Sequence, residues 1–202
     1  MNIVLTLLLV NAALGAFDTL WYHEYRNRLS ARIEHTRPEL RLHAARDAVY
    51  VVLYGGLAWW TPAGAIVAIV AALLAAEIVI TLADFVIEDR DRPLIGGISP
   101  GERILHSLMA IVYGTMLAHL IPVLLDGAVA RTATVEHGAH LALSIGATAA
   151  AVGIAVSGFR DALALVGVDP IWRRRPAPPA IVHRGPRRGS TITIPIDKRT
   201  YE

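Results

Sequence analysis

The chain has 202 residues, 54% of them hydrophobic, with a mean hydropathy of +0.49 and a formal net charge of +2. Soluble domains average about 45–50% apolar residues, so this composition, together with long apolar runs, favours an integral membrane protein. Cysteine is absent, which excludes disulfides, thiolate metal sites and a cysteine nucleophile. Any metal bound by this chain must therefore use His and carboxylate ligands.

Five hydrophobic spans are predicted, each long enough to cross a hydrocarbon core, which needs about 20 residues. They cover residues 3–28, 39–59, 63–89, 100–124 and 136–165. Pro38, Pro62 and Pro100 fit the first turn of a helix. The sequence thus predicts an all-α integral membrane protein, in which a four-helix bundle and a fifth transmembrane helix make up one domain over residues 1–166.

The arginine distribution predicts how the spans are oriented, because cytoplasmic loops carry an excess of Lys and Arg. The loops after the first and third spans and the segment after the fifth are arginine-rich, whereas the opposite loops hold only Arg131. This bias predicts an inner membrane of bacterial type, with the N-terminus outside and the C-terminus cytoplasmic. The basic, Pro- and Arg-rich tail at 167–202 is expected to lie along anionic lipid headgroups. No motif indicates a nucleic-acid partner.

An internal repeat relates residues 11–58 to residues 77–120. Each copy reads acid, E-x-R-x-R, loop, then E-x-x-x-H-x6-Y. The first copy is built on Asp18, Glu24, Glu39, His43 and Tyr50; the second on Asp84, Glu88, Glu102, His106 and Tyr113. We therefore expect two pseudo-symmetric helical hairpins, related by an axis along the membrane normal.

The acids and imidazoles of both copies fall at the cytoplasmic ends of four helices. Spacings of three and four residues place them on continuous helical stripes. The stripes are Glu77–Thr81–Asp84–Glu88–Asp91, His43–Asp47–Tyr50–Tyr54 and Glu102–His106–Met109–Tyr113. The first helix fits less well: at about 100° per residue, Asp18, His23 and Glu24 cannot all face inward unless the helix is distorted. Asp89, Arg90 and Arg92 are expected in the solvated exit from the membrane, and the place of Asp91 is left open.

Carboxylates and histidines on four helices of a bundle resemble the ligand set of the di-iron and di-manganese carboxylate proteins, including membrane oxidases of that kind. The resemblance covers about residues 18–113, and it departs from the family pattern because Glu and His are four residues apart here rather than three. It implies two metal ions, with iron expected and zinc or manganese as alternatives.

The resemblance also implies roles for individual residues. Glu24 and Glu88 would bridge the metals, Glu39 with His43 would bind one metal, and Glu102 with His106 would bind the other. Asp18 and Asp84 would be further ligands or would orient the histidines. Additional ligands or supporting residues are expected among His23, Asp47, Glu77, Tyr50 and Tyr113.

The function expected on this basis is oxidation, hydroxylation or desaturation of a lipid-soluble substrate by a membrane-embedded metalloenzyme. One alternative is a metal or proton transporter or ion-binding protein, with a path through Glu77 and Asn11. A zinc-dependent hydrolase would use the same ligands. A b-type haem protein would pair His43 with His106 and His119 with His140.

Overall fold

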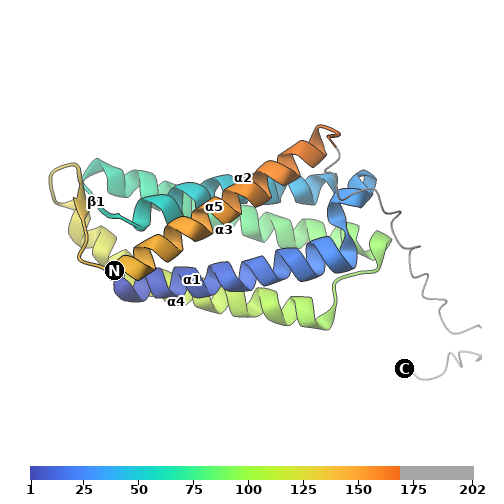
Figure 1. The fold of residues 1–202 in the computed structure, drawn as a ribbon, viewed down its shortest axis with the longest axis horizontal. Helices are drawn as coiled ribbons and strands as arrows, with labels where there is room; N and C mark the ends of the chain where they lie inside the picture. The colour runs from blue at the N-terminus through green and yellow to red at the C-terminus, as the bar shows by residue number, and fades with distance from the viewer. Residues whose placement is uncertain (169–202) are drawn as a thin grey trace, which may run out of the picture.

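The computed structural model describes residues 1–168 as five long helices that run along a common axis (Figure 1). In chain order the elements are α1 (Asn2–Phe17), the π-helix η1 (Asp18–Asn27), the 3-10 helix η2 (Leu29–Arg32), α2 (Ile33–Leu57), β1 (Trp60–Ala63), α3 (Ala65–Asp91), the 3-10 helix η3 (Arg92–Ile95), α4 (Pro100–Ala128), β2 (Ala133–Glu136) and α5 (Leu141–Leu165). The predicted basic tail lies outside the described residues, apart from its first two.

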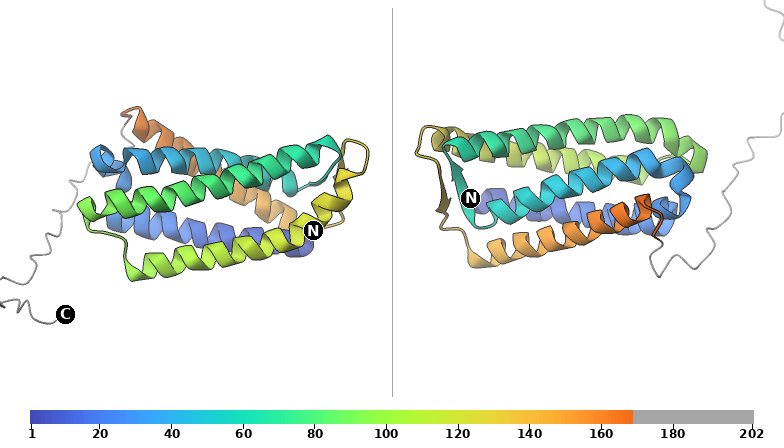
Figure 2. Two further views of the ribbon diagram at one scale, coloured as in Figure 1. Left: turned by 180° about the vertical axis from the view of Figure 1, so that it is seen from behind. Right: turned by 90° about the horizontal axis from the view of Figure 1, so that it is seen from above.

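The two ends of the bundle differ. One end carries the connections from α1 to α2 and from α3 to α4, and the other carries β1 and β2, as Figures 1 and 2 show. β1 pairs with β2 in antiparallel register, with Trp60 opposite Glu136. α1 packs mainly against α4, and α2 packs against α3 and α5. An apolar core that includes Leu5, Leu57 and Leu120 fills the half of the bundle nearer the strands.

Four helical segments are long and apolar enough to cross a membrane: Asn2–Asn27, Ala65–Ile95, Pro100–Ala128 and Leu141–Leu165. Their outer faces are apolar, as at Val79 and Val86, which are 66% and 70% exposed. Five spans were predicted; α2 does not meet this criterion of length and composition, although it is one of the five long helices of the bundle. Its charged residues explain why: Glu34, Arg37, Glu39, Arg41, Arg46 and Asp47 all lie on this helix.

Several predicted boundaries also need correction. Pro38 lies inside α2, which begins at Ile33 after the 3-10 turn η2, and Pro62 lies in β1. Neither short strand was predicted. The start at Pro100 is confirmed, because Ser99 accepts a hydrogen bond from the Glu102 backbone N–H while the Glu102 side chain accepts one from the Ser99 N–H. This capping box satisfies helix donors that would otherwise lack a partner.

The π-helix η1 is the local feature that matters most for the site. Its hydrogen bonds join residues five apart, which widens the turn and changes which side chains share a face. Asp18, Tyr22, His23 and Asn27 are buried together, whereas Glu24 turns away from them. The segment ends at Arg28 in a left-handed conformation with φ of 50°. This is the distortion that the first helix required if Asp18 and His23 were both to face inward.

The contact between α2 and α5 depends on a glycine. A Cβ added at Gly158 would lie 2.8 Å from the Asp47 Cβ, whereas one added at Gly153 on the same helix would meet nothing within 4 Å. We therefore expect Gly158→Ala to lower the free energy of unfolding by about 1–3 kcal/mol through overpacking. Gly153→Ala is the matched control and should not destabilise the protein. Thermal unfolding of both variants in the same detergent measures the difference, and equal melting temperatures would contradict this view of the α2–α5 contact.

Candidate metal centre

Eight acidic and imidazole side chains meet inside the bundle, near the end that carries η1, η2 and η3. We call this set the acid–histidine cluster; it consists of Asp18, His23, Glu39, His43, Asp84, Glu88, Glu102 and His106. Seven of these residues are buried, and His106 is partly buried with a side chain 12% exposed. The cluster draws on η1, α2, α3 and α4, so it depends on the tertiary fold rather than on any one helix.

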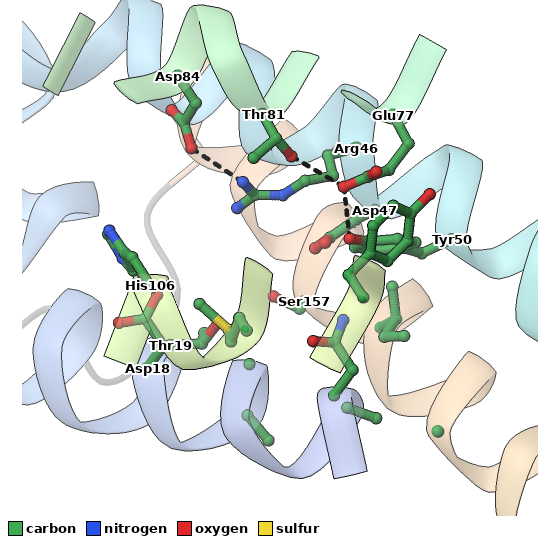
Figure 3. Close-up of a pocket in the computed structure, with 18 of the residues that line it drawn as sticks. Asp18, Thr19, Arg46, Asp47, Tyr50, Glu77, Thr81, Asp84, His106 and Ser157 are labelled. Carbon is green, nitrogen blue, oxygen red and sulfur yellow. Dashed lines mark hydrogen bonds and ion pairs between the residues drawn. The ribbon is translucent and has the colours of Figure 1, made fainter. Parts of the chain in front are cut away.

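Two aspartates each contact a histidine on a neighbouring helix. Asp18 Oδ2 lies 3.3 Å from His106 Nε2, and Asp84 Oδ2 lies 3.1 Å from His43 Nε2. Figure 3 shows Asp18 beside His106, and Asp84 joined to Arg46, whose Nη1 donates to the same Asp84 oxygen over 3.0 Å. In the predicted repeat, Asp18 corresponds to Asp84 and His106 corresponds to His43. The two Asp–His contacts are therefore equivalent positions of the two copies.

His23 lies between the two halves of the cluster. Its Nε2 is 3.3 Å from Asp18 Oδ2, without the geometry of a hydrogen bond. Its ring stacks on that of His43, with centroids 4.7 Å apart and an angle of 3° between the planes. His23 is therefore held close to a carboxylate and an imidazole, while its Nε2 makes no hydrogen bond within the described part of the chain.

Two groups of four residues bring ligand atoms within 4.8 Å of one another. The first consists of Asp18, His23, Glu102 and His106, and the second of His23, Glu39, His43 and Glu88. Glu39 and His43 thus fall in one group, and Glu102 and His106 in the other. His23 is common to both groups, although it was predicted only as an additional ligand or supporting residue. Asp84 is in neither group, and through its contact with His43 it is placed to orient that imidazole.

Arg92 is a central part of the site that sequence reasoning missed. The predicted solvated exit is wrong for this residue, which is fully buried, although Asp89 and Arg90 are exposed. Its guanidinium donates to both Glu39 oxygens, with 2.7 Å from Nη2 to Oε1 and 3.0 Å from Nε to Oε2. Its Nη2 also lies 3.3 Å from Glu102 Oε1. The cause is η3, which begins at Arg92 and turns the chain inward over the end of the bundle.

The cluster has more negative than positive charge. Its five carboxylates face two guanidiniums, those of Arg92 and Arg46. Burying a carboxylate without compensation is costly, so the surplus requires protons on the carboxylates or the imidazoles, or a bound cation. Three buried polar atoms also lack a hydrogen-bond partner among the described residues: Asp18 Oδ1, Asp84 Oδ1 and His23 Nε2. Buried groups of this kind are normally paired, and a cation is one partner that carboxylates and imidazoles can share.

Glu24 is not brought into either group. Its Oε1 lies 3.1 Å from Arg160 Nη2 on α5. Asp47 is partly buried against Gly158. The structure therefore gives Glu24 a contact with α5, and no support to its predicted bridging role.

The predicted residues deeper in the bundle form a separate polar group. Glu77 is 3% exposed and accepts hydrogen bonds from Tyr50 at 2.6 Å and from Thr81 at 2.8 Å (Figure 3). Tyr113 Oη faces Glu77 without completing a hydrogen bond to it. For the haem alternative, His119 and His140 are both exposed, so the structure gives no support to a second haem enclosed between them.

Comparison with protein-family models, with curated proteins and with solved structures finds no match. The site is therefore interpreted from its own geometry.

Proposed function

We propose that this chain is an integral membrane metalloenzyme, and that the acid–histidine cluster holds two metal ions, most simply iron. The observation that carries the proposal is the pair of four-residue ligand groups that share His23. The surplus of buried carboxylates and the unpartnered oxygens of Asp18 and Asp84 support it, because divalent cations satisfy both the charge and the free lone pairs. Zinc or manganese would suit the same donor set.

The surface of the bundle supports the membrane location. Exposed aromatic residues lie toward both ends, with Trp21 and Tyr25 near the cluster and Trp59 and Trp60 near the strands, as in the aromatic belts of membrane proteins. The arginine-rich loops lie at the cluster end, which we therefore assign to the cytoplasmic side. The matched contacts Asp18–His106 and Asp84–His43 support a pseudo-two-fold relation between the hairpins that contain α1–α2 and α3–α4.

The reaction class that fits best is oxidation of a lipid-soluble substrate. The metals would supply activation of dioxygen. In a hydroxylation, one oxygen atom enters a C–H bond and the other leaves as water, with two electrons and two protons from a cytoplasmic reductant. Desaturation would use the same inputs and release two waters. Asp18 and Asp84 would hold the His106 and His43 rings in place, and Arg92 would fix Glu39.

A transporter is the second candidate, because Glu77, Tyr50 and Thr81 extend the polar region into the bundle. An ion path would need to continue outward from Glu77. The buried side chains beyond it belong to the apolar core, including Leu74, Leu120 and Leu124, and no acidic or basic side chain among the described residues is buried there. We therefore favour the enzyme. A zinc-dependent hydrolase remains the alternative that uses the same ligands.

Metal content is the direct test. We expect the full-length protein, purified from its membrane without chelator, to carry about two metal ions per chain by elemental analysis, with no haem Soret band. Incubation with a strong chelator should lower the melting temperature, because a ligand that binds only the folded state stabilises it by about 2.7 kcal/mol at 100 times its Kd. A protein that holds no metal and whose melting temperature is unchanged by chelator would contradict the proposal.

A further inference from the structure

A large cavity adjoins the acid–histidine cluster. Its volume is about 880 Å³, and residues from all five long helices and from η1 line it. This lies in the upper part of the range of about 300–1,000 Å³ that is typical of small-molecule sites. At its inner end the cavity reaches Asp18, His23, Glu88 and His106. A molecule in the cavity would therefore touch the edge of the proposed metal centre.

The walls of the cavity open to the apolar surface of the bundle. Leu82 and Phe85 of α3 line the cavity and are also 58% and 37% exposed. Leu20 of η1 and Val156 of α5 line it on another side, and each is 65% exposed. These residues lie on three of the segments that are long and apolar enough to cross a membrane. A lipid-soluble molecule can thus enter sideways, without leaving the hydrocarbon phase.

The far end of the cavity carries polar groups that have no role in the cluster. Asn11 is 8% exposed, and its Oδ1 has no hydrogen-bond partner among the described residues. Tyr113 Oη, at the same end, also lacks one. Both side chains line the cavity, and they come from α1 and α4, which pack against each other. An unpaired buried polar group costs about 1–3 kcal/mol, so an acceptor and a hydroxyl in this position indicate a ligand group that can pair with them.

The chemistry of these two residues selects the ligand group. The Asn11 oxygen can only accept, whereas the Tyr113 hydroxyl can donate. A ligand hydroxyl can donate to the first and accept from the second at the same time. A pure hydrocarbon can do neither, and a carboxylate would lie beside the acidic Glu77.

We propose that the cavity binds a long-chain alcohol, with its hydroxyl at Asn11 and Tyr113 and its chain running toward His106. Glu77 and Asp84 are seven residues apart on α3, which is about 10 Å along the helix. The carbon next to the cluster therefore lies about 10 Å from the hydroxyl. Oxidation of this alcohol at the metal centre rests on the proposed function, whereas binding of the alcohol in the cavity does not depend on it.

Photo-crosslinking tests the binding directly. The full-length protein, as purified, is placed in phosphatidylcholine nanodiscs with 1-tetradecanol that carries a mid-chain diazirine, or with the matching diazirine tetradecane. We expect the alcohol probe to label peptides that line the cavity, and excess 1-tetradecanol to prevent this labelling. Asn11→Leu and Tyr113→Phe should each reduce it by about tenfold. Thr115→Val, an exposed polar-to-apolar change on α4, is the matched control and should have no effect.

Each outcome decides the proposal. Equal labelling by the alcohol and the alkane, or unchanged labelling in Tyr113→Phe, would overturn it, and cavity peptides left unlabelled by both probes would indicate water there instead. If Asn11→Leu fails to fold, Tyr113→Phe still carries the test, because it removes a single oxygen atom. The readout does not depend on metal content. If the protein holds two metal ions but the alcohol probe does not label the cavity, the alcohol site is wrong and the metal centre is unaffected. If the probe labels the cavity specifically but the protein holds no metal, the alcohol site is supported and the proposed oxidation is wrong.

Discussion

Replacing His23 with alanine is expected to abolish metal binding, whereas replacing its neighbour Glu24 is expected to leave it unchanged. His23 supplies a ligand atom to both four-residue groups. Glu24 instead contacts Arg160 on α5. Loss of a residue that only orients a ligand typically costs 10–100-fold in metal affinity, so we expect removal of His23 itself to cost more than about 100-fold. Glu24→Ala should stay within about twofold of the parent protein.

Elemental analysis and competition with a chelator of known affinity measure both variants. The comparison separates the two possible faces of the segment Asp18–Asn27, because a regular α-helix and the π-helix η1 direct different side chains inward. Full metal loading in His23→Ala together with loss in Glu24→Ala would show that the segment directs Glu24 rather than His23 toward the cluster. Melting temperatures of both variants identify any loss that comes from unfolding.

The helical stripes could be predicted from the sequence because they follow regular geometry. Glu77, Asp84 and Glu88 are spaced by seven and four residues on an uninterrupted helix, and all three are buried. Periodicity alone places such residues on one face. The helix start at Pro100 was also predictable, since the proline and the Ser99–Glu102 capping box act locally.

The π-helix could not be predicted, because its bounds depend on tertiary packing rather than on a local signal. The sequence showed only that Asp18, His23 and Glu24 conflict on a regular helix. It did not show which of them the chain would turn inward. The predicted repeat therefore aligned Glu24 with Glu88. In the structure His23, five residues after Asp18 on a wider turn, is the buried residue of η1 that corresponds to Glu88, which is buried four residues after Asp84 on α3.

The spacing of Arg92 indicated its burial, but the charged residues beside it indicated a solvated turn. Arg92 follows Glu88 by four residues and so continues the stripe of α3, but an arginine beside Asp89, Arg90 and Asp91 resembles a solvated turn. Only the inward course of η3 distinguishes the buried arginine from its exposed neighbour. Likewise α2 packs against α3 and α5 although its charges set it apart from the four membrane-length segments. Its charged residues Glu39 and Arg46 pair with Arg92 and Asp84, which lie outside α2.

Arg92→Leu is expected to destabilise the protein strongly. The guanidinium is fully buried and bound to Glu39 through both oxygens, and removing one partner of a buried pair costs about 3–5 kcal/mol. Arg90→Leu, two residues earlier, is the matched control: its side chain is 65% exposed, and such surface changes usually stay within about 0.5 kcal/mol. Equal unfolding free energies for the two variants would contradict the central place of Arg92.

The same variant also links stability to metal binding. Without Arg92, the cluster holds five carboxylates against Arg46 alone, so its need for a cation rises. Two rescues are expected. Arg92→Leu combined with Glu39→Leu should recover part of the loss, because an apolar pair can replace a buried ion pair. Added ferrous or zinc ions should stabilise Arg92→Leu by mass action, and should do so less when His23 is also replaced. If Glu39→Leu restores part of the free energy of unfolding but added metal does not, Arg92 belongs to an ion-pair network that is purely structural.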